Sequence, residues 1–230
     1  MSKLVLFDID GTLIGSGGVG TKSVVRAFRD LYGIENAMQG VDPNGNTDPL
    51  IFREALERNS PIPYDFQREY PRILRRYLEC LEEEVRTSRN SHVKPGILEL
   101  LEELSSIPDV FLGLATGNVE PGARLKLSVH DLNRFFPTGG FGDDSEIRRN
   151  LTRIAVEKAE RLYGRSFRGR DVFIIGDTPR DIDCGKALEG ICIAVATGSV
   201  SRDELLTCGP DHCFEDLKDY RRLLDLILGR

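Results

Sequence analysis

Four short apolar runs, separated by helical patterns, constrain the fold more than any other feature of the sequence. They cover Lys3–Asp8, Val110–Thr116, Asp171–Asp177 and Ile191–Thr197, and each is rich in Val, Ile, Leu or Phe without strict alternation. Runs of this kind are typical of strands that are buried on both faces of a sheet. Because strands that alternate with helices are joined by right-handed crossovers, the pattern predicts an α/β fold: a Rossmann-like parallel sheet with helices on both faces.

One long segment breaks this alternation. Between Gly15 and Asn90 there is no convincing strand, only helical patterns at Thr21–Tyr32, Asp48–Arg58 and Asp65–Thr87. This interval is longer than a crossover between neighbouring strands requires. We therefore expect an inserted all-helical domain over residues 15–90, and a core domain formed by residues 1–14 and 91–230.

The apolar runs end in polar signatures. Asp8-x-Asp10 follows the first run, Thr116-Gly117-Asn118 the second, and Gly176-Asp177 with Asp181 the third. In open α/β sheets ligands bind beyond the carboxyl ends of the strands, so these residues are expected to face one crevice. Two unit charges about 4 Å apart repel by roughly 4 kcal/mol at an effective dielectric constant near 20, so several gathered carboxylates require a cation. Oxygen ligands beside a substrate phosphate favour Mg²⁺.

The glycine-rich stretch after the first run has an alternative interpretation as a phosphate-binding P-loop. A P-loop that ended at Lys22-Ser23 would need glycines at positions 16 and 21, where the chain has Ser16 and Thr21. The glycines are out of register for that motif. A flexible connection out of the core domain is the preferred interpretation.

Composition narrows the class of protein. The net charge of −6 gives no sign of a nucleic-acid partner. Asp8 comes too early in the chain for the apolar region of a signal peptide. No apolar run is long enough for a membrane span. The five cysteines include no C-x-x-C pair, which fits a reducing compartment better than a disulfide framework or a zinc site. The cytoplasm is the expected location, without a membrane partner.

At this point the residues carry a family resemblance. The stretches Asp8-Ile9-Asp10-Gly11-Thr12-Leu13, Ala115-Thr116-Gly117-Asn118 and Ile175-Gly176-Asp177-Thr178-Pro179-Arg180-Asp181 resemble motifs I, II and IV of the haloacid dehalogenase-like hydrolase superfamily, in the same order. The helical insert is similar to the α-helical cap of its phosphoglycolate phosphatase-like and β-phosphoglucomutase-like members. The resemblance covers essentially the whole chain.

The resemblance implies a division of labour among these residues. Asp8 would be the nucleophile that becomes an aspartyl phosphate. Asp10 would protonate the leaving alkoxide and then activate the hydrolytic water. The metal residues would be Asp8, Asp177, the backbone carbonyl of Asp10 and, in support, Asp181, while the motif II residues Thr116, Gly117 and Asn118 would bind the phosphoryl group.

The third family motif departs from the pattern. Relatives often present Lys-Pro at the start of the helix before motif IV, whereas this chain has Arg148-Arg149-Asn150-Leu151. The missing lysine is either replaced by Arg149 or supplied by Lys126 from the helix after motif II. Lys126 is preferred because a compact ammonium approaches phosphate and carboxylate more easily than a planar guanidinium.

The implied activity is Mg²⁺-dependent hydrolysis of a small phosphorylated metabolite. Three alternatives remain: a sugar-phosphate mutase, a phosphonatase or a non-catalytic binding protein. A phosphonatase needs a lysine in the cap, and Lys22 is the only lysine of this chain between positions 15 and 89. Phosphoglycolate is one candidate substrate, although Asn46 stands where several capped relatives have a cation. The sequence does not distinguish a monomer from a homodimer.

Overall fold

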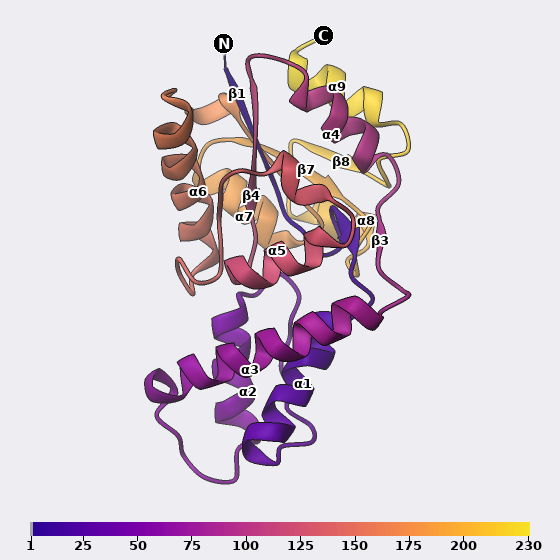
Figure 1. Ribbon diagram of the computed structural model, residues 1–230. Coiled ribbons are helices and arrows are strands. Elements are labelled where there is room, and N and C mark those ends of the chain that lie inside the picture. The colour runs from indigo at the N-terminus through magenta and orange to yellow at the C-terminus, as the bar shows by residue number, and fades with distance from the viewer. Residues whose placement is uncertain (1) are drawn as a thin grey trace.

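The central element is a parallel sheet whose strands are buried on both faces. The computed structural model describes residues 2–230, and the strand order is β5-β4-β1-β6-β7-β8 with every neighbouring pair parallel (Figure 1). The strands are β1 (Lys3–Phe7), β4 (Val110–Ala115), β5 (Gly139–Gly140), β6 (Val172–Gly176), β7 (Ile191–Val195) and β8 (His212–Phe214). The predicted α/β class with a parallel sheet is confirmed.

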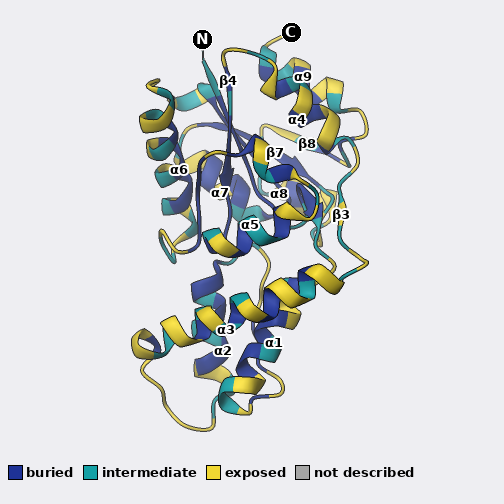
Figure 2. Cartoon of the chain, in the orientation of Figure 1, coloured by how far each residue is buried: buried dark blue, intermediate teal, exposed yellow. Residues whose placement is uncertain are grey.

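The alternation of side chains along β1 explains why both faces are covered. Val5 and Phe7 lie in an apolar cluster with Leu100 and Leu223, which come from the helices on one face. Leu4 and Leu6 lie in a second cluster with alanines of a helix on the other face. The first face carries α4 (Ile97–Ser105) and α9 (Tyr220–Leu228), and the second carries α6 (Arg148–Tyr163). Figure 2 shows the strands buried beneath these helices.

The helical insert forms a separate unit below the core in Figure 1. It contains α1 (Val19–Tyr32), α2 (Asp48–Asn59) and α3 (Phe66–Thr87), which pack around their own apolar cluster. The chain leaves and returns through β2 (Ile14–Gly15) and β3 (His92–Val93), a short antiparallel pair. The insert touches the core through α3 and α5 (Glu120–Ser128), and Val119 of the core belongs to the cluster of the insert.

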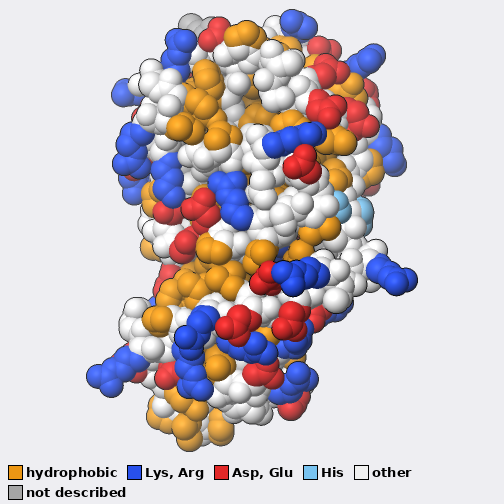
Figure 3. All heavy atoms as spheres, viewed as in Figure 1, with side chains coloured by type: hydrophobic (Ala, Val, Ile, Leu, Met, Phe, Trp, Pro, Cys, Tyr) orange, Lys and Arg blue, Asp and Glu red, His pale blue; other side chains and the backbone are white. Residues whose placement is uncertain are grey.

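The seam between α3 and α5 is an apolar groove on the surface. Leu74 and Leu78 of α3 line it together with Pro121 and Leu125 of α5. In Figure 3 apolar side chains gather where the helical insert meets the core.

The remaining helices are α7 (Pro179–Ala187) and α8 (Arg202–Thr207). The two short 3-10 turns span Leu132–Phe135 and Gly169–Asp171. Within residues 2–230, no helix combines the length and the apolar character that crossing a bilayer requires.

Candidate active site

Three adjacent strands bring the predicted site residues together. Asp8 follows β1, Thr116 follows β4 and Asp177 follows β6, and these strands are neighbours in the sheet. The register is fixed by backbone bonds: Asp8 N donates to Ile175 O at 2.9 Å, and Thr116 N donates to Gly140 O at 3.0 Å. Because the strands are parallel, their carboxyl ends form one edge where all three side chains meet.

A buried acidic cluster lies at this edge. Asp8, Asp177 and Asp181 each offer a carboxylate oxygen, and these oxygens lie within 4.8 Å of one another. Burial raises the pKa of Asp8 to about 6, against the opposing effect of Arg148 and with the help of Asp181 and Asp10. Burial, with Asp8 and Asp181 adding to it, raises the pKa of Asp177 well above its usual range. Such a cluster favours binding of a hard cation, because a cation offsets the repulsion between the buried carboxylates.

The loop after β1 packs closely against Asp177 of this cluster. Thr12 Oγ1 donates to Asp177 Oδ1 at 2.9 Å. Gly11 has a φ of +86°, and a Cβ at this position would lie 2.3 Å from Asp177 Oδ2. A side chain at position 11 would therefore displace a carboxylate of the cluster.

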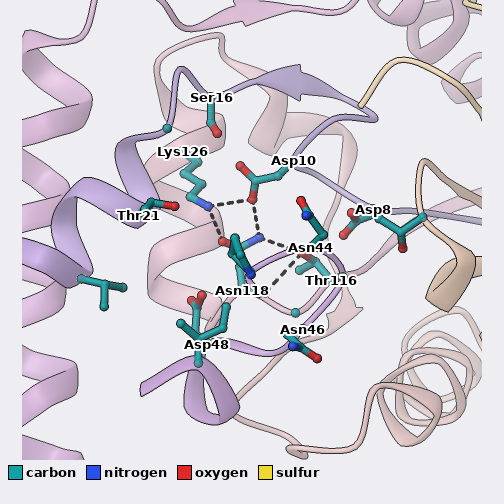
Figure 4. A pocket seen from close by; sticks show the side chains of 18 of the residues that line it. Asp8, Asp10, Ser16, Thr21, Asn44, Asn46, Asp48, Thr116, Asn118 and Lys126 are labelled. Atoms are coloured by element: carbon teal, nitrogen blue, oxygen red, sulfur yellow. Dashed lines mark hydrogen bonds and ion pairs between the residues drawn. The ribbon is translucent and has the colours of Figure 1, made fainter. Parts of the chain in front are cut away.

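Asp10 is held by a second set of contacts (Figure 4). Lys126 Nζ donates to Asp10 Oδ2 at 2.7 Å and to Asn118 Oδ1 at 2.6 Å, and Asn118 Nδ2 donates to Asp10 Oδ2 at 2.9 Å. Burial alone would raise the pKa of Asp10, but Lys126, together with hydrogen bonds that include the one from Asn118, holds that pKa below its usual value. Burial opposes the charge of Lys126, yet Asp10 and Asp48 raise its pKa overall. The side chain of Lys126 is 6% exposed, so Lys126 does not belong to a solvated helix face.

The two arginines at the start of α6 have different environments. Arg148 is 10% exposed, and its Nη2 lies 3.1 Å from Asp8 Oδ1 and 2.5 Å from Asp181 Oδ1. Arg149 is 62% exposed, and its Nη2 lies 2.8 Å from Asp183 Oδ2. Adjacent residues of a helix project about 100° apart, so only one of the two faces the site. The alternative in which Arg149 replaces the missing lysine is corrected: Arg148 lines the cavity, and Arg149 is a surface residue.

Thr116, Gly117 and Asn118 follow β4 and line the same cavity as Asp8 and Asp10. Thr116 is buried, and its Oγ1 accepts hydrogen bonds from the backbone N of Asn118 at 3.3 Å and from its Nδ2 at 2.8 Å. A Cβ on Gly117 would lie 2.0 Å from the backbone oxygen of Asn46. Position 117 must therefore be glycine for the insert to pack this closely against the core.

The segment before α2 docks on this loop. Asp48 N donates to Gly117 O at 2.7 Å, and Asp48 Oδ2 accepts from Val119 N at 2.9 Å. Arg148 Nη1 donates to Gly45 O at 3.1 Å. Burial raises the pKa of Asp48 to about 6, although Lys126 and the Val119 amide favour its charged form.

Core and insert enclose one cavity of about 220 Å³. Asp8, Asp10, Lys126, Arg148 and Asp177 line it from the core, and further residues line it from the insert. Two charged lining residues, Arg148 and Asp48, received no role from the sequence. Arg148 was passed over in favour of its neighbour Arg149, and Asp48 lies in the insert, for which the sequence indicates only helical patterns.

Comparisons with known proteins agree with this geometry. Residues 5–195 match the model of the haloacid dehalogenase-like hydrolase family. Among curated proteins, a phosphoglycolate phosphatase of Synechococcus elongatus is 24% identical over 94% of this chain and 94% of the relative. A phosphoglycolate phosphatase of Pseudomonas syringae is 25% identical over 95% of this chain and 78% of the relative.

Among solved structures, CbbY of Rhodobacter sphaeroides in complex with phosphate has the same fold. The TM-score is 0.74 at 18% identity, over 95% of this chain and 96% of that chain. The family match spans both strand-end aspartate motifs and the helical insert between them. The protein is therefore a hydrolase that belongs to the haloacid dehalogenase-like family.

Proposed function

We propose that the protein is a Mg²⁺-dependent phosphatase that hydrolyses a small phosphate monoester through an aspartyl phosphate on Asp8. In this proposal residues 15–90 act as a cap over the core of residues 1–14 and 91–230. The observation that carries it is the separation of two aspartate environments: Asp8 lies in the acidic cluster, and Asp10 is held by Lys126 and Asn118. This separation supports a division of roles in which Asp8 attacks and Asp10 transfers the proton.

The donor set fits Mg²⁺. Asp8, Asp177 and Asp181 offer only oxygen ligands, and burial together with repulsion between these carboxylates raises the pKa values of Asp8 and Asp177. These residues, with the backbone carbonyl of Asp10, would hold the ion. When bound, Mg²⁺ would neutralise charge on the phosphoryl oxygens and keep Asp8 ionised.

In this proposal Asp8 and Asp10 have different roles in the two chemical steps. Asp8 attacks phosphorus, the bond between phosphorus and the ester oxygen breaks, and the leaving oxygen takes a proton from Asp10. Asp10 then removes a proton from a water that attacks phosphorus, the bond between phosphorus and Asp8 breaks, and inorganic phosphate leaves with the Asp8 carboxylate regenerated. Thr116, the Gly117 amide and Lys126 would bind the phosphoryl group during both steps.

The ionisation of Asp10 must change between these steps. In the free enzyme Lys126 keeps Asp10 charged, which suits the base of the second step. A bound phosphoryl dianion shares the charge of Lys126 and repels Asp10, so it raises the pKa of Asp10 and favours the protonated acid of the first step.

The alternatives have different support. Lys22 is exposed and does not line the cavity, which argues against a phosphonatase that needs a cap lysine. The binding-protein alternative is disfavoured because both predicted catalytic aspartates are placed at the cavity. A mutase would use the same residues, and it would return an isomeric ester in place of free phosphate.

The test is phosphate release from an aryl phosphate and from small phosphate esters, with and without Mg²⁺. Release that depends on Mg²⁺ and is lost in Asp8→Asn, but retained in the surface control Asp183→Asn, supports the proposal. Folded, Mg²⁺-loaded protein that releases no phosphate from any ester would refute it. Product analysis by ³¹P NMR separates hydrolysis from isomerisation.

A further inference from the structure

The wall that the helical insert contributes to the cavity carries no positive side chain. Ser16, Thr21 and Asn44 supply polar groups, Val24 and Ile51 supply apolar surface, and Asp48 supplies a carboxylate. Within residues 2–230, no lysine, arginine or histidine of the insert is among the lining residues. The wall that would face the leaving group is therefore neutral or negative.

Nearby arginines of the insert are engaged elsewhere. Arg26 pairs with Glu83 at 2.6 Å and with Glu84 at 2.8 Å. Arg53 pairs with Glu146 at 2.6 Å. Neither arginine lines the cavity, so neither is placed to bind an anion there.

The cations of the core are also paired. Lys126 contacts Asp10 at 2.7 Å, and Arg148 bridges Asp8 and Asp181. In the proposed reaction these charges serve the phosphoryl group and the catalytic aspartates. No cation among the lining residues remains for a second anionic group on the substrate.

Asp48 adds a negative charge to the wall. Its side chain is buried and points toward Asn118 and Lys126 (Figure 4). Its Oδ2 is fixed by the Val119 amide at 2.9 Å, which anchors the carboxylate at the cavity. A fixed carboxylate repels a substrate carboxylate or second phosphate and accepts a hydrogen bond from a substrate hydroxyl.

We propose that the substrate is a small phosphate ester of a neutral, hydroxyl-bearing alcohol, and that Asp48 selects against a second anionic group. This inference rests on the proposed phosphatase function. The cavity of about 220 Å³ is smaller than the roughly 300–1,000 Å³ of typical ligand pockets, which matches a leaving group of a few carbon atoms. Val24 and Ile51 provide apolar surface for its carbon chain.

The test uses pairs of esters that differ only in one group. Hydroxyethyl phosphate is compared with phosphoglycolate, and glycerol phosphate with phosphoglycerate, because each pair exchanges a CH₂OH for a carboxylate. Charges roughly 6 Å apart at an effective dielectric constant near 20 imply a preference on the order of 10–100-fold in kcat/KM. Wild-type enzyme should prefer the neutral ester of each pair by at least about tenfold.

Two variants test the assigned residue. Asp48→Asn keeps an oxygen for the Val119 amide but removes the charge, and should reduce the preference by about tenfold or more. Asp143→Asn is the matched control, because Asp143 Oδ1 accepts from the next amide, Glu120 N, at 2.9 Å but lies outside the cavity lining. Thr21→Lys places a cation on the exposed rim and should raise kcat/KM for phosphoglycolate over that of the wild type.

The outcomes separate this inference from the proposed function. Mg²⁺-dependent turnover with equal or better use of the carboxylate esters would overturn the inference and leave the phosphatase standing. An unchanged preference in Asp48→Asn would overturn the role of Asp48. Failure of folded enzyme to release phosphate even from an aryl phosphate would overturn the phosphatase and the inference with it.

Discussion

Replacing Lys126 by methionine tests whether this lysine supplies a cation to the proposed phosphate site in addition to Arg148. Methionine keeps the length of the side chain and removes the charge. Lys126 Nζ lies 2.7 Å from Asp10 Oδ2 and 2.6 Å from Asn118 Oδ1, at the edge of the cavity in which the phosphoryl group would bind. The change therefore removes a buried positive charge that contacts the proposed acid at the cavity.

The size of the effect follows from Coulomb's law. A cation about 4 Å from one added negative charge is worth roughly 4 kcal/mol at an effective dielectric constant near 20. Since about 1.4 kcal/mol corresponds to a factor of ten, kcat/KM is expected to fall by roughly a thousandfold. Charge removal also lets burial raise the pKa of Asp10. Because Asp10 must be deprotonated to act as the base of the second step, the acidic limb of the pH profile of kcat should move to higher pH.

The assay is steady-state phosphate release across pH, with Arg149→Met as the matched control. Arg149 is exposed and pairs with Asp183 on the surface, so its loss should change kcat/KM by less than about threefold, consistent with the small energy of an exposed ion pair. Far-ultraviolet circular dichroism and thermal unfolding confirm that both variants fold. Loss of activity in Arg149→Met with Lys126→Met unaffected would refute the assignment.

Two further perturbations have expected outcomes. In metal-free protein burial raises the pKa of Asp8 from 3.8 to about 6, so the folded state binds this proton more tightly than the unfolded state does. The resulting contribution to folding stability is fully present below about pH 4 and is lost as the pH rises through 6. This amounts to about 3 kcal/mol. Mg²⁺ should therefore stabilise the fold much more at pH 7 than at pH 5, and equal shifts in thermal unfolding at both pH values would contradict this origin. In Gly117→Ala the new Cβ would lie 2.0 Å from the backbone oxygen of Asn46, so the cap segment must move. kcat/KM should fall by about a hundredfold while the core stays folded, and unchanged kinetics would show that this contact does not position the site.

The sheet was predictable because its central strands are apolar on both faces. A run such as Val172–Gly176 cannot lie on a solvated surface, so its sequence alone indicates a buried parallel strand. The short strands Gly139–Gly140 and His212–Phe214 escaped prediction, because two or three residues carry no periodic signal and pair only where a neighbouring strand already exists. Their positions depend on the assembled sheet.

The site was predictable where strand ends determine it. Asp8, Thr116 and Asp177 meet because parallel strands end at the same edge. The choice between Arg148 and Arg149 depends on where α6 begins, and Ile147 provides no side-chain cap to mark that point. A shift of one residue turns a helix by about 100°, which exchanges the buried and exposed arginine.

The place of Asp48 depends on the packing of two layers that are distant in sequence. Its partner is the backbone amide of Val119, which belongs to the core. Sequence patterns within either layer do not reveal which backbone groups meet across the seam. Docking of the insert therefore decides which of its residues reach the cavity.

The most direct measurement is to trap the covalent intermediate on Asp8. Asp10→Asn enzyme is mixed with Mg²⁺ and an aryl phosphate, quenched in acid, digested and analysed by mass spectrometry. The aryl leaving group needs little protonation, whereas water attack needs a base, so the intermediate should accumulate in this variant. We predict a phosphoryl group on the peptide that carries Asp8, together with a burst of phenolate. Turnover without a burst, or a phosphoryl group on another residue, would contradict the assignment of Asp8 as the nucleophile.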